Sequence, residues 1–421
     1  MLTVEDNLHL TQTTKGTPMG ELLRRYWHPI AAVTEFEDRA TKQIRLLSED
    51  FVLYKDRSGV FGLLDLHCPH RRADLSYGFV EECGLRCSYH GWAFDEKGDC
   101  ISAPFEDTTG NGRFHEQMST NAYPVEVKAG LIFAYLGPLP APLCPNWETF
   151  TYENVFKQIV FADVPCNWLQ ASENNIDPVH FEWLHNTWPA RQVGQFDYTS
   201  PRHVEVGFDE YEFGFGYRRL LEGSDKSSAL WNEPRYLLLP NVIIPECLHF
   251  EYRVPVDDTH TLSVIWHCEP VPLEQRPFVQ ERIPYWWAPL TNSVTGRFIT
   301  SHVINQDTVA WVGQGAVADR EHEHLRRSDA GVVMFRNQLL ADINAVAEGR
   351  DPKGVFRDSV AHAVIRWPDN RRERIDQGVP KANWPTMRAA SALTPGNDYF
   401  QFYAGQPEEV RRAFEAAMGI A

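Results

Sequence analysis

A chain of 421 residues, of which 43% are hydrophobic, is long enough for two or three globular domains. Its net charge of −17 argues against binding to nucleic acid or to an anionic membrane surface, because both require a basic surface. No apolar run approaches the length of about 20 residues that spans a membrane, and no secretory signal is recognisable. We therefore expect a cytoplasmic protein whose eight cysteines form no disulfide framework.

The first third of the sequence is predicted to form a small β domain. Residues 1–42 are expected to be a helical lead-in, because apolar residues follow a Thr-Pro helix start at helical spacing. Short strands follow, with a hairpin predicted over 51–64. The proline-rich segment 137–147 is typical of a linker. These features predict a β domain over residues 43–155.

The remaining segment, 156–421, mixes helices and strands. A helix is predicted at 167–177, and alternating patterns across 200–270 indicate strands. The segment 328–349 is predicted to be a long helix that begins at a serine N-cap and stops at its last glycine. A final helix is expected at 406–418, with a proline in its first turn.

Two pairs of cysteine and histidine form the first candidate site. One residue separates Cys68 from His70, two separate Cys87 from His90, and 16 residues lie between the pairs. Each pair lies on a short predicted loop, so its two side chains can converge on one metal centre. Such ligands suit a tetrahedral zinc site, or a [2Fe–2S] cluster with two cysteines on one iron and two histidines on the other. The ligand types alone do not separate these possibilities.

The flanking sequences, CPHRRADL and CSYHGWAFD, resemble the Rieske signature of ring-hydroxylating oxygenases, and this resemblance favours the cluster. The paired arginines after the first histidine are similar to the phthalate-dioxygenase subgroup. Pro69 is expected to stiffen the first loop, Gly91 to permit a tight second loop, and Trp92 to shield the cluster from water. The nearby Cys83 and His67 are interpreted as structural residues.

A second candidate site lies in the segment NWLQASENNIDPVHFEWLHN, which contains Asp177, His180 and His185. Two histidines and a carboxylate suit a mononuclear Fe(II) site with open positions for O2 and substrate. The spacing resembles the mononuclear-iron motif of the same oxygenases. The segment SHVINQDTVAWVGQG resembles the distal part of that family, and this implies Asp307 as the third ligand.

The carboxylates of this motif have alternative roles. Taken alone, Asp177 before Pro178 is typical of a helix N-cap. The resemblance implies instead that Asp177 bonds both to His180 and to a cluster histidine of the neighbouring subunit, which by position is His90. Glu173 matches a motif position, but a solvated or structural acid explains it equally well.

The spacing of the two histidines predicts an irregular helix. Positions five apart differ by about 140° around a regular α-helix, so His180 and His185 would not share a face. We therefore predict that the helix widens or ends between them, as π-type turns do at functional sites.

Other charged residues have simpler interpretations. His322 and His324 are expected to lie on a solvated face, and the remaining histidines have no ligand-like partners at useful spacing. Arg71, Arg72 and Arg86 surround the cluster loops. They could dock an acidic ferredoxin or reductase, although plain solvation also explains them.

The resemblance extends over nearly the whole chain and is strongest at 60–100, 165–188 and 301–330. It implies an α+β fold, with an N-terminal Rieske β domain and a C-terminal helix-grip domain in which an antiparallel sheet wraps a long helix. It also implies a homotrimer or hexamer without a separate β subunit. Electrons would pass from NAD(P)H through a reductase or ferredoxin to a [2Fe–2S] cluster and then to mononuclear Fe(II). The expected reaction is O2-dependent hydroxylation or oxidative O- or N-dealkylation of a small aromatic substrate.

Two alternative functions remain open from the sequence. One is a Rieske electron carrier without oxygenase activity, and the other is a zinc-stabilised ligand-binding protein. The intact second motif argues against the first alternative, and a colourless protein would favour the second. No arginine can be assigned to a substrate carboxylate. Five aromatic residues are candidates for the substrate pocket, although a place in the core explains each of them better: Trp188, Phe196, Trp266, Tyr285 and Trp287.

Overall fold

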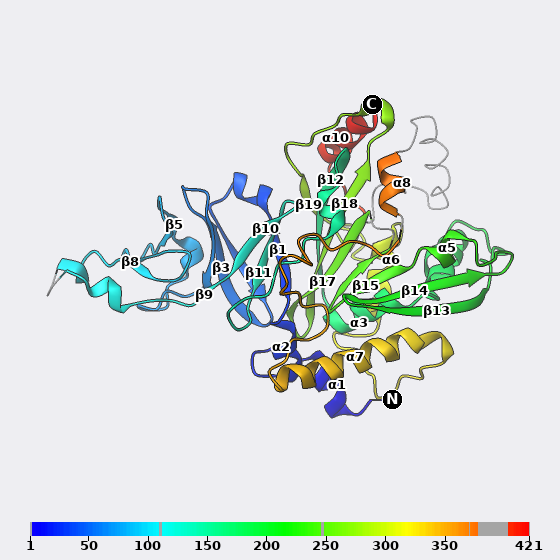
Figure 1. Ribbon diagram of the computed structural model, residues 1–421, viewed down its shortest axis with the longest axis horizontal. Coiled ribbons are helices and arrows are strands. Elements are labelled where there is room, and N and C mark those ends of the chain that lie inside the picture. Colours follow the sequence, from blue (N-terminus) through cyan, green and yellow to red (C-terminus); the bar gives the residue numbers. More distant parts are fainter. Residues whose placement is uncertain (1, 109–111, 246–247, 370, 378–402, 421) are drawn as a thin grey trace.

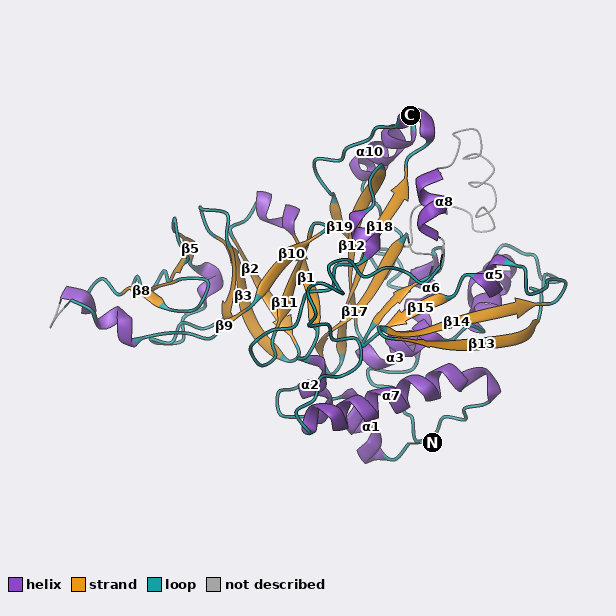
Figure 2. Ribbon diagram, viewed as in Figure 1, coloured by secondary structure: helices purple, strands orange, loops and turns teal. Residues whose placement is uncertain are grey.

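The structure is a computed structural model that describes residues 2–108, 112–245, 248–369, 371–377 and 403–420 (Figure 1). Small sheets of short strands occupy one side of the molecule, and a large sheet with helices beside it occupies the other (Figure 2). This arrangement confirms the predicted α+β class. None of the described helices combines the length and the apolar character needed to cross a membrane.

Two short helices precede the first strand. They are α1 (Val4–Thr11) and α2 (Pro18–Leu23), and both contact the long helix α7 (Ala330–Ala347). The side-chain oxygen of Thr17 accepts a hydrogen bond from the Gly20 N–H, and a proline follows it at the first helical position. The predicted Thr-Pro helix start is therefore confirmed.

Three small antiparallel sheets follow these helices. The predicted hairpin over 51–64 is confirmed, because β3 (Glu49–Lys55) and β4 (Phe61–Asp65) pair with each other and Phe51 lies opposite Asp65. The turn between the two strands contains Gly59, whose φ is 93°. In spatial order, the strands are β1 (Trp27–Ala32), β11 (Leu131–Tyr135) and β10 (Val125–Lys128) in one sheet; β2 (Thr41–Leu46), β3 (Glu49–Lys55), β4 (Phe61–Asp65) and β9 (Ala122–Tyr123) in the second; and β5 (Phe79–Val80), β6 (Leu85–Arg86), β7 (Ala93–Phe94) and β8 (Cys100–Ser102) in the third.

The large sheet has eight strands, and all neighbouring pairs are antiparallel except β12 and β19. The predicted antiparallel sheet of the second domain is thus confirmed. In spatial order, its strands are β13 (His203–Tyr211), β14 (Gly214–Leu221), β15 (Arg235–Leu238), β16 (Val242–Ile244), β17 (His249–Asp257), β18 (His260–Pro270), β12 (Val155–Val164) and β19 (Tyr285–Trp287).

Most of the helices lie in the second part of the chain. The predicted helix at 328–349 is confirmed as α7, but its N-cap is Asp329, because Ser328 lies in the preceding 3-10 turn. Gly349 follows the helix end with a φ of 77°. The other helices are α3 (Trp168–Glu173), α4 (Trp188–Gln192), α5 (Ala229–Asn232), α6 (Val303–Gly313), α8 (Arg371–Gln377) and α10 (Glu408–Met418), together with a π-helix, η7 (Phe181–Thr187). The 3-10 turns are η1 (Val33–Glu37), η2 (Leu75–Tyr77), η3 (Glu106–Thr108), η4 (Phe114–Gln117), η5 (Glu148–Thr151), η6 (Asn174–Ile176), η8 (Leu273–Gln275) and η9 (Arg327–Asp329).

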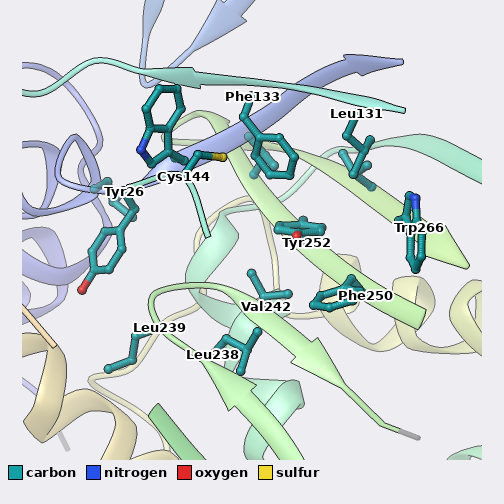
Figure 3. Close-up of a cluster of buried hydrophobic side chains, with 14 of the residues drawn as sticks. Tyr26, Leu131, Phe133, Cys144, Leu238, Leu239, Val242, Phe250, Tyr252 and Trp266 are labelled. Atoms are coloured by element: carbon teal, nitrogen blue, oxygen red, sulfur yellow. The ribbon is translucent and has the colours of Figure 1, made fainter. Parts of the chain in front are cut away.

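One continuous hydrophobic core joins the small sheet β1–β11–β10 to the large sheet. Figure 3 shows Leu131 and Phe133 of β11 facing Phe250 and Tyr252 of β17, with Trp266 beside them. Each large apolar side chain buried in this way contributes about 1.5–3 kcal/mol. The shared core therefore fixes the position of the sheet β1–β11–β10 relative to the large one.

Candidate metal centres and substrate cavity

The four residues of the first candidate site come together at the tips of two loops. Cys68 and His70 follow β4, and Cys87 and His90 lie between β6 and β7. The two thiols are buried and lie within hydrogen-bonding distance of each other, and the histidine ring centroids are 4.5 Å apart. Burial raises the pKa of the Cys68 thiol to about 11, with the neighbouring Cys87 adding to the effect.

These residues fit a metal cluster. The buried Nδ1 atom of His70 has no hydrogen-bond partner in the described part of the chain, and metal ligation would satisfy it. Trp92 stacks on the His70 ring at 4.5 Å and is buried, so it covers the site as predicted. Arg86 donates to the carbonyl oxygen of Gly91 and pairs with Glu81, so it supports the second loop.

The second candidate site brings three predicted residues together. The Oδ1 atom of Asp307 lies 3.2 Å from Nε2 of His185 and 3.8 Å from Nε2 of His180. One ligand atom from each residue lies within 4.8 Å of the other two. Desolvation opposes protonation of His185, but Asp307 raises its pKa above the ordinary value. The buried carboxylate of Asp307 favours a positive charge between it and the two imidazoles. A divalent cation bound by these three side chains would supply that charge.

The predicted widening of the helix is confirmed. The segment that carries His185 is the π-helix η7, and His180 immediately precedes it. A π-helix bonds residues five apart, so the two rings come to the same face, with centroids 5.1 Å apart. The sequence spacing that conflicts with a regular α-helix therefore places both imidazoles beside α6.

Neighbouring polar groups orient these side chains. Nδ1 of His185 lies 2.9 Å from Oε1 of Gln306, and Nδ1 of His180 lies 3.5 Å from Oδ2 of Asp177. Asp177 also accepts a hydrogen bond from the Val179 N–H, but it caps no α-helix, because a 3-10 turn ends at this residue. Burial opposes ionisation of Asp177, while its bond to His180 lowers its pKa below the ordinary value.

The π-helix is also held from the outer strands. Glu182 is buried, and its Oε1 atom accepts a hydrogen bond of 2.7 Å from Arg219 of β14. Its Oε2 atom lies 3.1 Å from Nε2 of His203 on β13. The preceding Phe181 ring contacts the guanidinium groups of Arg219 at 4.3 Å and Arg235 at 4.0 Å. These contacts support a helix form that is rare in proteins.

Glu173 has a structural role away from the two histidines. Its carboxylate accepts hydrogen bonds from Arg320 and Arg336, and all three side chains are buried. Burial opposes ionisation of Glu173, but the two guanidinium charges hold its pKa below the ordinary value. The cluster connects α3, which leads into the second site, to α7.

Substituting Glu173→Gln is expected to lower the free energy of unfolding by about 3–5 kcal/mol, because the buried Arg320 loses its counter-charge and Arg336 keeps only its ion pair with Glu323. Urea denaturation followed by circular dichroism measures this change. Glu348→Gln is the matched control, because Glu348 forms an exposed pair with Arg350. An equal effect of the two substitutions would contradict the structural role of Glu173.

A cavity of about 370 Å³ adjoins the second site. None of the five predicted aromatic candidates lines it, and Trp266 is wholly buried in the core instead. The described lining residues are Asn174, Asn175, His180, Phe181, His185, Arg235, Ile243, Pro245, Leu248, His249, Glu251, His267, Glu269, Val303, Ile304 and Asp307.

Sequence reasoning missed the ionisable residues of this cavity. His249 and Glu251 on β17, and His267 and Glu269 on β18, are all buried in it, and Arg235 also lines it. The expectation that the remaining histidines have no ligand-like partners holds for metal binding in the described part of the chain, where only His180, His185 and Asp307 form such a group; it did not foresee that histidines would line the cavity. Each pair is two residues apart in a strand, a spacing that places both side chains on one face. Polar residues alternating with apolar ones in HFEYR and HCE were the available signal.

The other charged residues follow the simpler interpretations. His322 and His324 are exposed, and His322 pairs with Asp319, as expected for a solvated face. Arg71 and Arg72 are exposed beside the first site. Cys83 is exposed and lies outside the first site.

Comparison with known proteins places the chain in one family. Residues 26–124 match the model of the Rieske [2Fe-2S] domain, and residues 275–368 match the LigXa C-terminal domain like model. The first match covers the four residues of the first site and favours an iron–sulfur cluster over zinc.

Several curated relatives are oxygenase subunits. The chain is 48% identical over 421 residues to the 5,5'-dehydrodivanillate O-demethylase oxygenase subunit of Sphingobium sp., an alignment that covers 100% of this chain and 98% of the relative. It is 32% identical over 409 residues to the phthalate 4,5-dioxygenase oxygenase subunit of Pseudomonas putida, covering 86% and 91% of the two chains.

A solved structure, NdmA of Pseudomonas putida CBB5, has the same fold, with a TM-score of 0.58 at 19% identity and coverage of 79% of this chain and 94% of that one. The full-length relatives and the second site do not favour a plain electron carrier or a zinc protein. The chain belongs to the Rieske non-haem iron ring-hydroxylating oxygenases, as the α subunit that acts as terminal oxygenase.

Proposed function

We propose that this oxygenase removes a methyl group from an aromatic methyl ether by oxidation. The observation that carries the proposal is identity of 48% along the whole chain to an O-demethylase oxygenase subunit. Relatives named as dioxygenases are 34%, 32% and 28% identical, and the cavity beside the second site has room for an aromatic ring.

The two groups of residues bind different metal centres. Cys68, His70, Cys87 and His90 hold the [2Fe–2S] cluster, and the second site, His180, His185 and Asp307, holds Fe(II). When bound, the cluster supplies single electrons and the mononuclear iron activates O2. The donor types and the convergence of the side chains support both assignments.

The protein positions the ether and excludes water. Phe181, Ile243 and Leu248 form apolar parts of the cavity wall, against which the aromatic ring of the substrate would pack beside the second site. Insertion of one oxygen atom into a methyl C–H bond gives a hemiacetal. Its C–O bond then breaks, so that the products are a phenol and formaldehyde. The second oxygen atom leaves as water, with two electrons and two protons from outside the chain.

Electrons enter from other proteins. We assign NAD(P)H as the source, acting through a reductase, with or without a ferredoxin that docks near the exposed Arg71 and Arg72. Solved structures with a similar fold include the complex between the oxygenase and the ferredoxin of carbazole 1,9a-dioxygenase. We also propose that residues 43–155 form the Rieske domain and that residues 156–421 form the catalytic domain.

Electron transfer between the two sites needs a second subunit. The lobe β5–β8 and the helices α3 and α6 lie on opposite sides of the sheet β1–β11–β10 (Figures 1 and 2). His90 is exposed at one end, and Trp183 of the π-helix is 61% exposed at the other. In a homotrimer or hexamer, His90 of one subunit would meet Asp177 of the next.

Metal analysis and product analysis test this function. We expect about three irons and two acid-labile sulfides per chain, with negligible zinc, in anaerobically purified protein. With a reductase and NADH, an aryl methyl ether should yield formaldehyde and a phenol in equal amounts. A cis-dihydrodiol without formaldehyde would show a dioxygenase instead, and zinc without sulfide would contradict both metal assignments.

A further inference from the structure

The side chain of Gln306 joins one histidine of the second site to the segment that precedes α6. Gln306 is the neighbour of Asp307 on this helix and is 1% exposed. Its Oε1 atom lies 2.9 Å from Nδ1 of His185, and its Nε2 atom donates a hydrogen bond of 3.0 Å to the carbonyl oxygen of Thr300. Both ends of this buried amide are therefore bonded, one of them to a candidate iron ligand.

These two bonds fix the tautomer of His185. A carbonyl oxygen only accepts hydrogen bonds, so the amide nitrogen of Gln306 must face Thr300 and its oxygen must face the imidazole. The amide oxygen accepts, so Nδ1 of His185 carries the proton. A histidine that binds a metal is neutral, and its Nε2 atom then has a lone pair. This atom lies 3.2 Å from Oδ1 of Asp307, so two candidate ligands face each other.

A closed chain of hydrogen bonds holds the amide in place. The hydroxyl group of Thr300 donates a hydrogen bond of 2.9 Å to Oε1 of Gln192. Gln192 is the last residue of α4, and α4 directly follows the π-helix that carries His185. The chain therefore runs from His185 through Gln306 and Thr300 back to the end of the same helical segment. An acceptor that is itself held at its other end restricts rotation of the imidazole.

The two histidines of the second site differ in the group behind them. Behind His180 lies the carboxylate of Asp177, 3.5 Å from Nδ1, and the Asp177 side chain is 30% exposed. Behind His185 lies the neutral amide of Gln306, which is buried. A carboxylate and an amide both accept the imidazole proton, but only the carboxylate adds negative charge near the metal. The structure therefore supports His185 through a fixed and uncharged acceptor.

We propose that Gln306 is a positioning residue of the iron site, which presents Nε2 of His185 to Fe(II) and does so without adding charge. The inference rests on the proposed function, because it takes the second site as the iron site. A carboxylate at position 306 would select the same tautomer and would attract the cation more strongly. An apolar side chain would leave the imidazole proton without its acceptor and the ring free to turn.

Two substitutions of Gln306 test this role by iron binding, without turnover. Competition with a chelator of known affinity would measure Fe(II) binding at the second site, in anaerobic full-length protein that keeps its cluster. We expect Gln306→Leu to weaken Fe(II) binding by about 10–100-fold, the usual cost of losing a group that orients a metal ligand. Gln306→Glu should bind Fe(II) at least as tightly as the wild type, although it can no longer donate to Thr300.

The two substitutions separate positioning from a merely structural role. If the amide only tied Thr300 to α6, both variants would lose that bond and both would bind iron more weakly. If Gln306→Leu fails to fold by circular dichroism, iron binding by Gln306→Glu alone decides between the two roles. Gln314→Leu is the matched control, because Gln314 is exposed at the far end of the same helix and bonds only to Ala310. It should keep the wild-type affinity for iron.

The outcomes distinguish this inference from the proposed function. Wild-type iron affinity in a folded Gln306→Leu variant, or weaker binding in Gln306→Glu, would overturn the role of Gln306. Formaldehyde release by the wild type would still support demethylation in that case. Conversely, opposite effects of the two substitutions without formaldehyde from any aryl methyl ether would support the role of Gln306 and contradict demethylation. A wild-type protein that binds no Fe(II) beyond its cluster would overturn both.

Discussion

Replacing His180 by alanine is expected to abolish turnover while leaving the visible absorption of the Rieske cluster unchanged. The substitution removes one of the three groups whose ligand atoms lie within 4.8 Å of one another, and no other described residue belongs to this group. Turnover should fall by more than about 100-fold, because loss of a residue that only orients a metal ligand already costs about 10–100-fold. Iron should fall from about three to about two atoms per chain, with sulfide unchanged.

His322→Ala is the control for this experiment. His322 is 83% exposed and pairs with Asp319, so its loss should change neither iron content nor turnover. Wild-type turnover in His180→Ala would contradict the assignment of the second site. Loss of the cluster absorption would show instead that the substitution disturbs the whole fold.

Mixing two inactive variants is expected to restore activity. A Cys68→Ser chain lacks the cluster but keeps the second site, and a His180→Ala chain has the reverse defect. The two sites of one chain lie on opposite sides of a sheet, so a cluster in one subunit would serve the iron of the next (Figure 1). Randomly mixed trimers should recover about a quarter of the wild-type rate, since one neighbouring pair in four has donor and acceptor in the right order.

The mixing experiment also tests Asp177. Adding Asp177→Asn to the Cys68→Ser chain should lower the restored rate by about 10–100-fold, because Asp177 lies against the His180 ring that receives the electron. The same substitution in the His180→Ala chain is the control and should have no effect. Co-purification of an untagged chain with an affinity-tagged chain of the other variant would establish that the chains exchange subunits. Restored activity in a monomer fraction would contradict transfer between subunits.

Local patterns allowed much of the fold to be predicted, and they identified two sets of residues that the structure brings together. The spacing of Cys68, His70, Cys87 and His90 on two loops depends on only a few residues of backbone, and the structure brings their side chains together. The geometry of His180 and His185 also followed from helix periodicity, because a five-residue spacing conflicts with an α-helix. The π-helix resolves that conflict.

The substrate cavity could not be predicted in the same way. Whether a strand face points to core or cavity depends on what packs against it, so Trp266 and His267, which are neighbours in sequence, lie on different faces of β18. The same holds for Glu173, whose partners Arg320 and Arg336 are distant in sequence. Its motif position gave no indication of two buried guanidinium groups.

The π-helix has a consequence for how this enzyme can vary. Deleting one residue between His180 and His185 would let the segment wind as an α-helix, with the histidines four apart and still on one face. Every residue after the deletion would then turn by about 100° relative to those before it. Glu182 and Thr187, which are joined by a hydrogen bond across the wide turn, would lose that contact. Substitutions on the exposed side are therefore easier to accommodate here than a change in segment length, and the number of residues between the ligands is itself a structural requirement.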